Sequence, residues 1–369
     1  MMNNSTIPPN NLGRPAGIEL LRAATQHKTL TAKQTKQLNE YLAGPPDSKD
    51  AFIIKRAADW MKPVKGKKQQ PGGKLFDHFW YEGELCIMFA DTNVGKSILA
   101  VQIADSLSRG EAIPGFGTAR PTERVLYFDF ELTAAQFEKR YSSTDEGIFP
   151  FTSDFYRLVF NPDSVGAPRF ASYADYLNNG IENVLVTTKA RVLIVDNITC
   201  LRSGTEAAAS AVSLMKNLQT LKNKYGLSIL VLAHTPKRNP AKPVTRNDLQ
   251  GSKMLINFAD SAFAIGESQT SPGLRYFKQI KQRSGIEVFG ANNVALCRMI
   301  KPANFLHFEF TGFGPEAAHL QHYTEQQRKV TEERIAELNK QGLSVRNIAA
   351  ETGISFSTVH RVVRRLGKV

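Results

Sequence analysis

The sequence is poor in cysteine, in long apolar segments and in acidic residues relative to basic ones. Its three cysteines, Cys86, Cys200 and Cys297, are isolated in apolar surroundings, which favours reduced core thiols over a disulfide framework or a metal site. No apolar run approaches the roughly 18 residues that span a bilayer, so we expect no membrane partner. Residues 1–21 lack the apolar centre of a secretory signal, which predicts a cytoplasmic protein.

Basic residues dominate the charge of this chain. The 47 lysines and arginines outnumber the 34 acidic residues, and the formal net charge is +13. A positive surface attracts polyanions and releases their counterions. The charge alone fits DNA, RNA or an acidic membrane surface, so the choice among them depends on motifs.

The chain length and the positions of its glycine- and proline-rich breaks predict three parts. They are an N-terminal helical appendage and basic linker at 1–74, an α/β domain at 75–315, and a small helical domain at 321–369. Helical patterns in the first part occur at 18–25, 31–42 and 50–61, before a lysine-rich stretch at 62–74. This stretch is typical of a solvated tether, and contact with nucleic acid is the alternative.

Short apolar runs alternate with helical patterns through the middle of the chain. Strands are expected at 85–90, 124–130, 192–196, 228–233 and 261–265. The long segments between the first three have room for helices, which predicts βαβ units around a mostly parallel sheet. Closer spacing predicts antiparallel strands at 275–282, 295–300 and 307–311.

A phosphate-binding loop is predicted where the first strand meets a helical pattern at 98–107. Strand, tight loop and helix together direct backbone N–H groups at phosphate oxygens. Lys96 would neutralise the β- and γ-phosphates of ATP, and the Ser97 hydroxyl would bind Mg²⁺. The expected ATP-binding residues are Asp91, Thr92, Asn93, Val94, Gly95, Lys96, Ser97 and Ile98.

The loop departs from the full Gly-x-x-x-x-Gly-Lys-Ser pattern because Ala90 stands at the first glycine position. Alanine is acceptable there if the position keeps ordinary strand-end dihedrals. Asn93 is the non-glycine type that best accepts a left-handed loop conformation.

Two acidic residues at predicted strand ends are candidates for ATP hydrolysis. Asp196 follows four apolar residues, as the magnesium-binding acid of a Walker B strand does. Glu131 ends the run at 125–131 and is the candidate for polarising the attacking water. Asp129 is the alternative, because alternation along a strand places it on the same face as Glu131.

Two segments carry a resemblance to known motor proteins. The sequence FDFELTAAQFEKR at 128–140 is similar to the corresponding part of DnaB-type replicative helicases, in which the glutamate is catalytic. The sequence ILVLAHTPKR at 229–238, with LQGS at 249–252, resembles RepA-type plasmid helicases and related RecA-like ATPases. The likeness covers about 83–314. It implies a RecA-like P-loop fold and a γ-phosphate sensor at His234, for which an ordinary loop histidine is the alternative.

The same resemblance implies a basic pair that reaches ATP on a neighbouring subunit. The segment KQIKQR at 278–283 is similar to that strand, and Lys281 and Arg283 share one side of it. Such a finger offsets transition-state charge and requires a homo-oligomer, either a ring or a filament. A solvated basic strand is the alternative interpretation.

The last part of the chain has the pattern of a helix-turn-helix. A helix at 345–351, a turn with Gly353 and a helix from Ser355 place small and apolar residues where two helices cross. This resembles the domain of resolvase-type DNA-binding proteins, and a helical hairpin for protein contacts is the alternative. The expected DNA-binding residues are Ser355, Ser357, Thr358, Arg361, Arg364 and Arg365.

These patterns favour an oligomeric DNA-associated ATPase, a helicase-like or replication-initiation motor of a plasmid or mobile element. A DNA-binding regulator or recombination accessory protein, in which ATP switches assembly, is the second hypothesis. A KaiC-like signalling ATPase is the third.

Overall fold

The computed structural model describes residues 30–36, 73–117, 120–161, 173–197, 207–249, 255–321 and 325–366. The chain forms two compact units, Met1–Pro71 and Gly72–Val369. The predicted helices at 18–25 and 50–61, almost all of the linker at 62–74, Cys200 and residues 250–252 lie outside the described residues. Of the helix predicted at 31–42, residues 32–36 are described and helical. Within the described residues, no helix combines the length and apolar character that a bilayer crossing requires.

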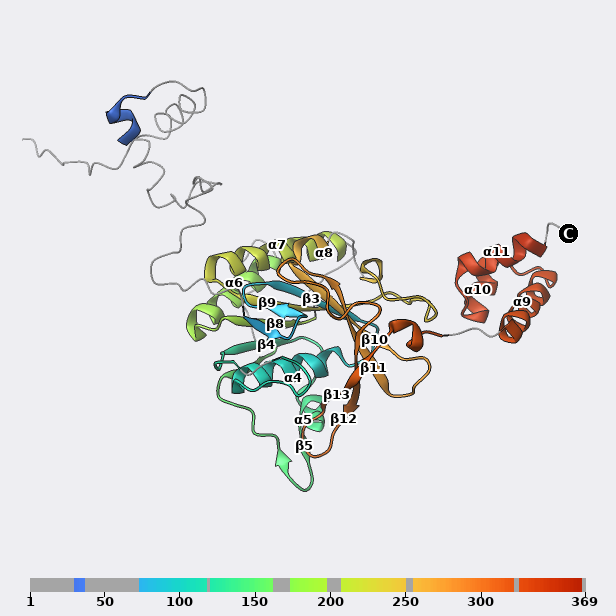
Figure 1. Cartoon of the computed structure of the whole chain (residues 1–369), viewed down its shortest axis with the longest axis horizontal. Coiled ribbons are helices and arrows are strands. Elements are labelled where there is room, and N and C mark those ends of the chain that lie inside the picture. Colours follow the sequence, from blue (N-terminus) through green and yellow to red (C-terminus); the bar gives the residue numbers. More distant parts are fainter. Residues whose placement is uncertain are drawn as a thin grey trace, which may run out of the picture. The chain divides into compact units, whose positions relative to one another are not determined.

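A nine-stranded sheet forms the centre of the second unit (Figure 1). Its strand order is β13-β12-β11-β10-β3-β9-β8-β4-β7. The pairs from β10 to β7 are parallel, and the pairs from β10 to β13 are antiparallel. The strands are β3 (Leu85–Ala90), β4 (Val125–Asp129), β7 (Phe155–Leu158), β8 (Val192–Asp196), β9 (Ser228–His234), β10 (Ser261–Glu267), β11 (Leu274–Lys281), β12 (Val294–Ile300) and β13 (His307–Gly314). This confirms the predicted α/β class with a mostly parallel sheet.

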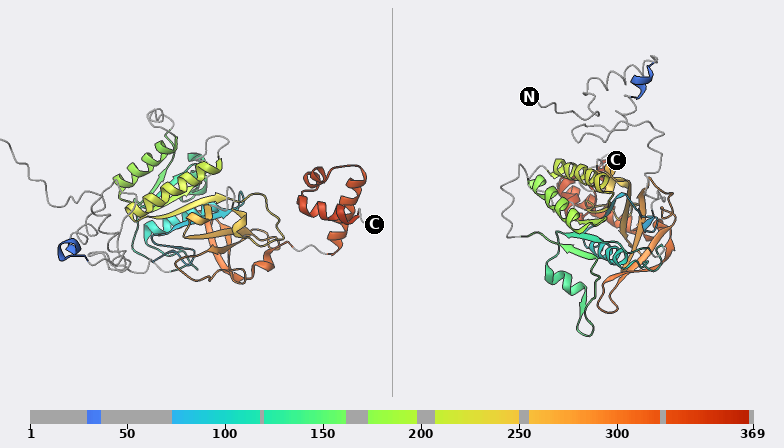
Figure 2. Two further views of the ribbon diagram at one scale, coloured as in Figure 1. Left: turned by 90° about the horizontal axis from the view of Figure 1, so that it is seen from above. Right: turned by 90° about the vertical axis from the view of Figure 1, so that its left-hand side faces the viewer.

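Helices cover both faces of the sheet, so its central strands are completely buried (Figures 1 and 2). On one face lie α4 (Lys96–Arg109) and an aromatic core that includes Phe76 and Phe79. On the other lie α6 (Tyr173–Thr188), α7 (Ala207–Tyr225) and α8 (Leu255–Phe258). The smaller elements are β1 (Lys74–Phe76), β2 (Trp80–Tyr81), α5 (Ala134–Arg140), β5 (Ser142–Ser143), β6 (Gly147–Ile148), η2 (Arg246–Asp248) and η3 (Glu316–His319).

Several predicted boundaries differ from the observed ones. The strand predicted at 124–130 ends at Asp129, and the helix predicted at 98–107 begins at Lys96 and ends at Arg109. This helix starts early because Gly95 caps it with a left-handed backbone, φ 109°. Cys86 and Cys297 are buried free thiols, as predicted.

The C-terminal helices α9 (Glu325–Lys340), α10 (Val345–Thr352) and α11 (Phe356–Leu366) pack on one another. Gly353 adopts φ 69° between α10 and α11, the left-handed conformation that the predicted turn requires. Their shared core consists of Ile335, Leu338, Ile348, Val359 and Val362. Helix α9 therefore contributes to a core that we predicted from α10 and α11 alone.

Candidate functional site

The loop between β3 and α4 has the backbone that the motif requires. Asn93 adopts φ 62° and Gly95 φ 109°, so the two positive-φ positions of the loop carry residue types that tolerate them. A Cβ on Gly95 would lie 2.6 Å from the Phe308 ring and 2.8 Å from Met299 Sδ. Ala90 pairs in register with Ile265 and His234 as the last residue of β3. Alanine therefore fits the position where the full motif has glycine.

The Lys96 side chain folds back across this loop. Its Nζ donates to the carbonyl oxygens of Ala90 (3.1 Å) and Asp91 (2.8 Å), and the residue is only 5% exposed. Burial lowers the pKa of Lys96, and the nearby carboxylates of Asp196 and Glu131 partly oppose this effect. The ammonium group thus lies at the loop and beside two acidic side chains.

Asp196 ends β8 and is completely buried. Its Oδ2 accepts a 2.7 Å hydrogen bond from the Tyr127 hydroxyl, and the carboxylate is also hydrogen-bonded to the Ser97 side chain. Burial raises its pKa to about 6, although both hydrogen bonds favour the charged form. Its Oδ1 has no hydrogen-bond partner among the described residues. A buried, unpaired carboxylate oxygen beside a serine hydroxyl fits the hard-cation ligand set of Mg²⁺.

Glu131, Asn197 and His234 meet at the tips of three adjacent strands. His234 Nε2 lies 3.2 Å from Glu131 Oε1 and 2.8 Å from Asn197 Nδ2, and Asn197 also hydrogen-bonds Glu131. Hydrogen bonding to His234 lowers the pKa of Glu131, against the opposing effect of burial. Asn197 was missed by the sequence analysis, because nothing but its position after Asp196 distinguishes it from a loop asparagine.

Asp129 and Glu131 occupy different environments. Asp129 is buried, pairs with Arg157 at 2.8 Å and accepts hydrogen bonds from the backbone of Glu131 (3.1 Å) and Leu132 (2.9 Å). Strand β4 ends at Asp129, so the alternation used to place both acids on one face does not extend to Glu131. Asp129 holds the turn, whereas Glu131 faces His234.

Lys281 and Arg283 lie far from this loop along the sheet. Lys281 is opposite Ala262 in the register of β10 and β11, at the amino ends of the parallel strands. Its Nζ donates to the carbonyl oxygens of Ile256 (2.6 Å) and Ala259 (2.7 Å), and Arg283 pairs with Asp260 at 3.2 Å. The phosphate loop follows the carboxyl end of β3, so neither side chain reaches the loop of its own chain.

The predicted DNA-binding side chains surround the start and exposed face of α11. Ser355 accepts a hydrogen bond from the backbone N–H of Thr358 (3.3 Å), so its hydroxyl caps the helix. Ser357, Arg361 and Arg364 are exposed, whereas Thr358 is half-buried. Arg365 forms an ion pair with Glu332 of α9 at 2.6 Å, so it also holds the two helices together.

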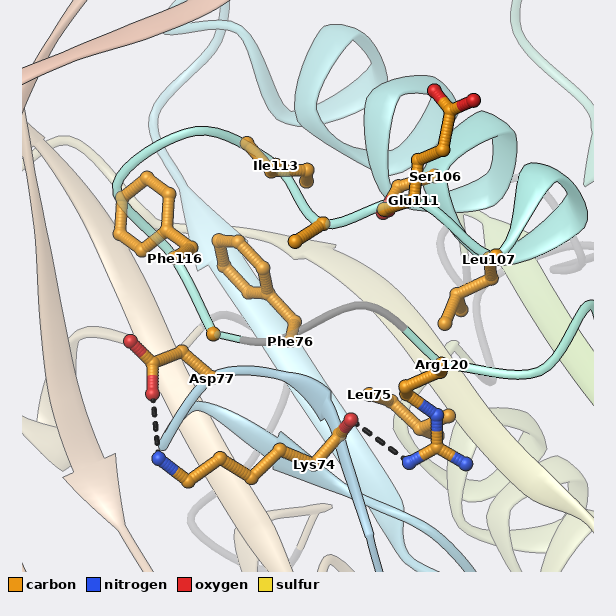
Figure 3. Close-up of a pocket in the computed structure, with 13 residues that line it drawn as sticks. Lys74, Leu75, Phe76, Asp77, Ser106, Leu107, Glu111, Ile113, Phe116 and Arg120 are labelled. Carbon is orange, nitrogen blue, oxygen red and sulfur yellow. Dashed lines mark hydrogen bonds and ion pairs between the residues drawn. The ribbon is translucent and has the colours of Figure 1, made fainter.

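A pocket at a separate position adjoins β1 and the end of α4 (Figure 3). Lys74 Nζ pairs with Asp77 Oδ1 at 2.9 Å, and Arg120 donates to the Lys74 carbonyl oxygen at 2.8 Å. Both basic side chains are held by contacts within the pocket wall, and we assign the pocket no ligand.

A phosphate loop on a central parallel strand, with an acid at a nearby strand tip, defines a P-loop ATPase. A family model described as AAA domain matches residues 54–240, about half of the chain, and the chain belongs to this family. A solved structure of a KaiC-like protein from the hyperthermophilic archaeon Pyrococcus horikoshii OT3 is similar at 14% identity. It has a TM-score of 0.43 and covers 66% of this chain and 99% of that chain. No curated protein matches the chain.

Proposed function

We propose that this protein is an oligomeric, DNA-dependent ATPase, a helicase-like or replication-initiation motor of a plasmid or mobile element. The observation that carries the ATPase part is the unpaired Asp196 Oδ1 beside Ser97 and the phosphate loop. The DNA part is supported by the net charge of +13 and by the exposed arginines of α11.

Each side chain of the site has a proposed role. Residues Asp91 to Ile98 bind ATP, with Lys96 on the β- and γ-phosphates. Ser97 and Asp196 would hold Mg²⁺, which supplies charge neutralisation for the phosphoryl oxygens when bound. Glu131 orients and polarises the attacking water, and His234 responds to the γ-phosphate through its contact with Glu131.

Oligomerisation is proposed from the position of Lys281 and Arg283. Both lie near the amino ends of the parallel strands, whereas the phosphate loop follows the carboxyl end of β3. They can therefore act on ATP only across a subunit contact. Their contacts with 256–260 would orient them on the surface that meets the neighbour.

The test is ATP hydrolysis by the purified full chain with no DNA, single-stranded DNA and double-stranded DNA, together with a strand-displacement assay. The proposal expects DNA to stimulate hydrolysis and Lys96→Ala to abolish it. If the rate of ATP hydrolysis is the same with and without DNA and no strand displacement occurs, the protein is not a motor.

A regulator of DNA that uses ATP to switch assembly is the second candidate, and the helical unit of α9 to α11 favours it. A helix-turn-helix suits a site-specific binder. Deletion of residues 321–369 separates the two. A motor keeps its ATPase activity and unwinds generic DNA without these residues, whereas a regulator loses DNA association.

A further inference from the structure

Helix α11 exposes an aromatic ring at its first residue. Phe356 is 55% exposed, whereas Val359 and Val362 of the same helix enter the shared core. A large apolar side chain costs free energy when it stays in water. The core of this small unit consists of five buried residues with five partly buried ones packed against them, and Phe356 belongs to neither set.

The residues around Phe356 are of a particular kind. His360 stacks on the Phe356 ring with 6.0 Å between centroids and 13° between planes. Arg364 continues the same row at helical spacing, and Ser357 and Arg361 form the adjacent exposed row. Among the described residues, Arg361 and Arg364 have no acidic partner, in contrast to Arg365. The face is apolar at one point and cationic beside it.

A DNA major groove offers a partner with the matching chemistry. The C5-methyl group of thymine is an apolar feature on base edges that otherwise present hydrogen-bonding groups, and phosphates flank it. An aromatic ring at the start of the helix packs on such a methyl, while neighbouring arginines contact phosphates or guanine.

We infer that Phe356, backed by His360, is a specificity-determining residue that reads a thymine methyl group in duplex DNA. This inference rests on the proposed DNA-binding role of α9 to α11. It goes beyond that role, because it assigns the base type and the chemical group that are recognised. It also predicts that Phe356 contributes selectivity while Arg361 and Arg364 contribute general affinity.

The experiment begins with selection of a preferred duplex from a randomised library by the full chain. Each thymine in that duplex is then replaced by deoxyuridine, which removes only the methyl group. Wild-type protein should bind about three- to fourfold more weakly at one or two positions, the expected effect of losing one buried methyl. The Phe356→Ala variant has no ring to contact the methyl group, so the same replacements should change its affinity by less than about 1.5-fold.

Two matched variants serve as controls. Val330→Ala removes another exposed apolar side chain of this unit, 62% exposed on α9, and should keep the full response to deoxyuridine. Arg361→Ala should lower the affinity for the thymine duplex and for the deoxyuridine duplex by the same factor. Thermal unfolding of each variant verifies that the helices remain folded.

The possible results distinguish failure of the thymine contact from failure of the proposed DNA binding. An equal deoxyuridine response in wild type and Phe356→Ala overturns the inference and leaves DNA binding intact. Failure to enrich any duplex overturns both. If Phe356→Ala abolishes self-association and leaves DNA affinity unchanged, the ring is a contact between copies of this chain, and the inference is wrong.

Discussion

The Tyr127 hydroxyl donates a 2.7 Å hydrogen bond to Asp196 Oδ2, and the two residues belong to adjacent parallel strands. Burial raises the pKa of Asp196 to about 6, and this hydrogen bond acts in the opposite direction. Magnesium requires the charged carboxylate. Binding of MgATP should therefore weaken as the pH falls through about 6.

Tyr127→Phe should move the midpoint of this pH dependence upward by about 0.7 pH unit, since one hydrogen bond contributes roughly 1 kcal/mol. The measurement is MgATP affinity between pH 5 and pH 8. Tyr141→Phe is the matched control, because Tyr141 is also buried but its hydroxyl has no partner among the described residues. A downward shift, or an equal shift in both variants, would refute the role of the Tyr127 hydrogen bond.

Glu131→Gln should slow ATP hydrolysis by roughly 10²- to 10⁴-fold while nucleotide binding is retained, because the amide cannot accept a proton from the attacking water. Single-turnover kinetics and nucleotide affinity measure the two effects separately. Asp129→Asn should instead lower the free energy of unfolding by roughly 1–3 kcal/mol, because it weakens the charged hydrogen bonds to Arg157 and the turn. If Asp129→Asn abolishes hydrolysis in a stable protein, the assignment of the two acids is reversed.

Gly95→Ala should abolish ATP binding and destabilise the fold by roughly 1–3 kcal/mol, since φ is 109° and the added Cβ would meet the Phe308 ring. Ala90→Gly restores the full motif and is the informative partner. It should leave ATP affinity unchanged and lower stability by about 0.5–1 kcal/mol, because Ala90 already has strand geometry. A large gain in affinity would show that Ala90 distorts the loop.

Arg283→Ala should lose most ATPase activity if the side chain acts on a neighbouring subunit, where such fingers contribute roughly 10³- to 10⁵-fold. Lys222→Ala is the control, because Lys222 pairs with the same Asp260 at 2.6 Å but its side chain is only 13% exposed, against 52% for Arg283. Mixing the Arg283→Ala and Lys96→Ala proteins should restore activity. A contact between the two then combines the intact Lys96 of one subunit with the intact Arg283 of the other. No recovery from mixed oligomers, despite subunit exchange, would contradict action across the contact.

The parts of the fold that the sequence predicts well are those with a strong local pattern. Strands β3 and β8 are completely buried, so their residues form unbroken apolar runs, and each leads directly into polar residues of the site. Strand β7 was missed because it is a four-residue edge strand with half-exposed side chains, which leaves no such pattern. The strands β1 and β2 were missed because they are only three and two residues long, too short for a period to show.

The parts of the site that escaped prediction depend on how distant segments pair. Tyr127 looks like a core aromatic until β4 pairs with β8, where it lies opposite Ile194 and its hydroxyl reaches Asp196 two residues further along the strand. Asn197 gains its importance from the neighbouring tip of β9, which brings His234 within 2.8 Å. Strand alternation was the wrong guide for Asp129 and Glu131, because the chain leaves the sheet between them.

The phosphate loop and Arg283 lie at opposite ends of the strands, and this separation constrains any assembly in which one subunit completes the site of the next. The contact joins two unlike surfaces, so a two-fold symmetric dimer cannot complete both sites in this way. Head-to-tail addition either closes into a ring with every site complete or grows as a helix with one incomplete site at an end. The number of active sites per assembled particle would therefore reveal whether the particle closes.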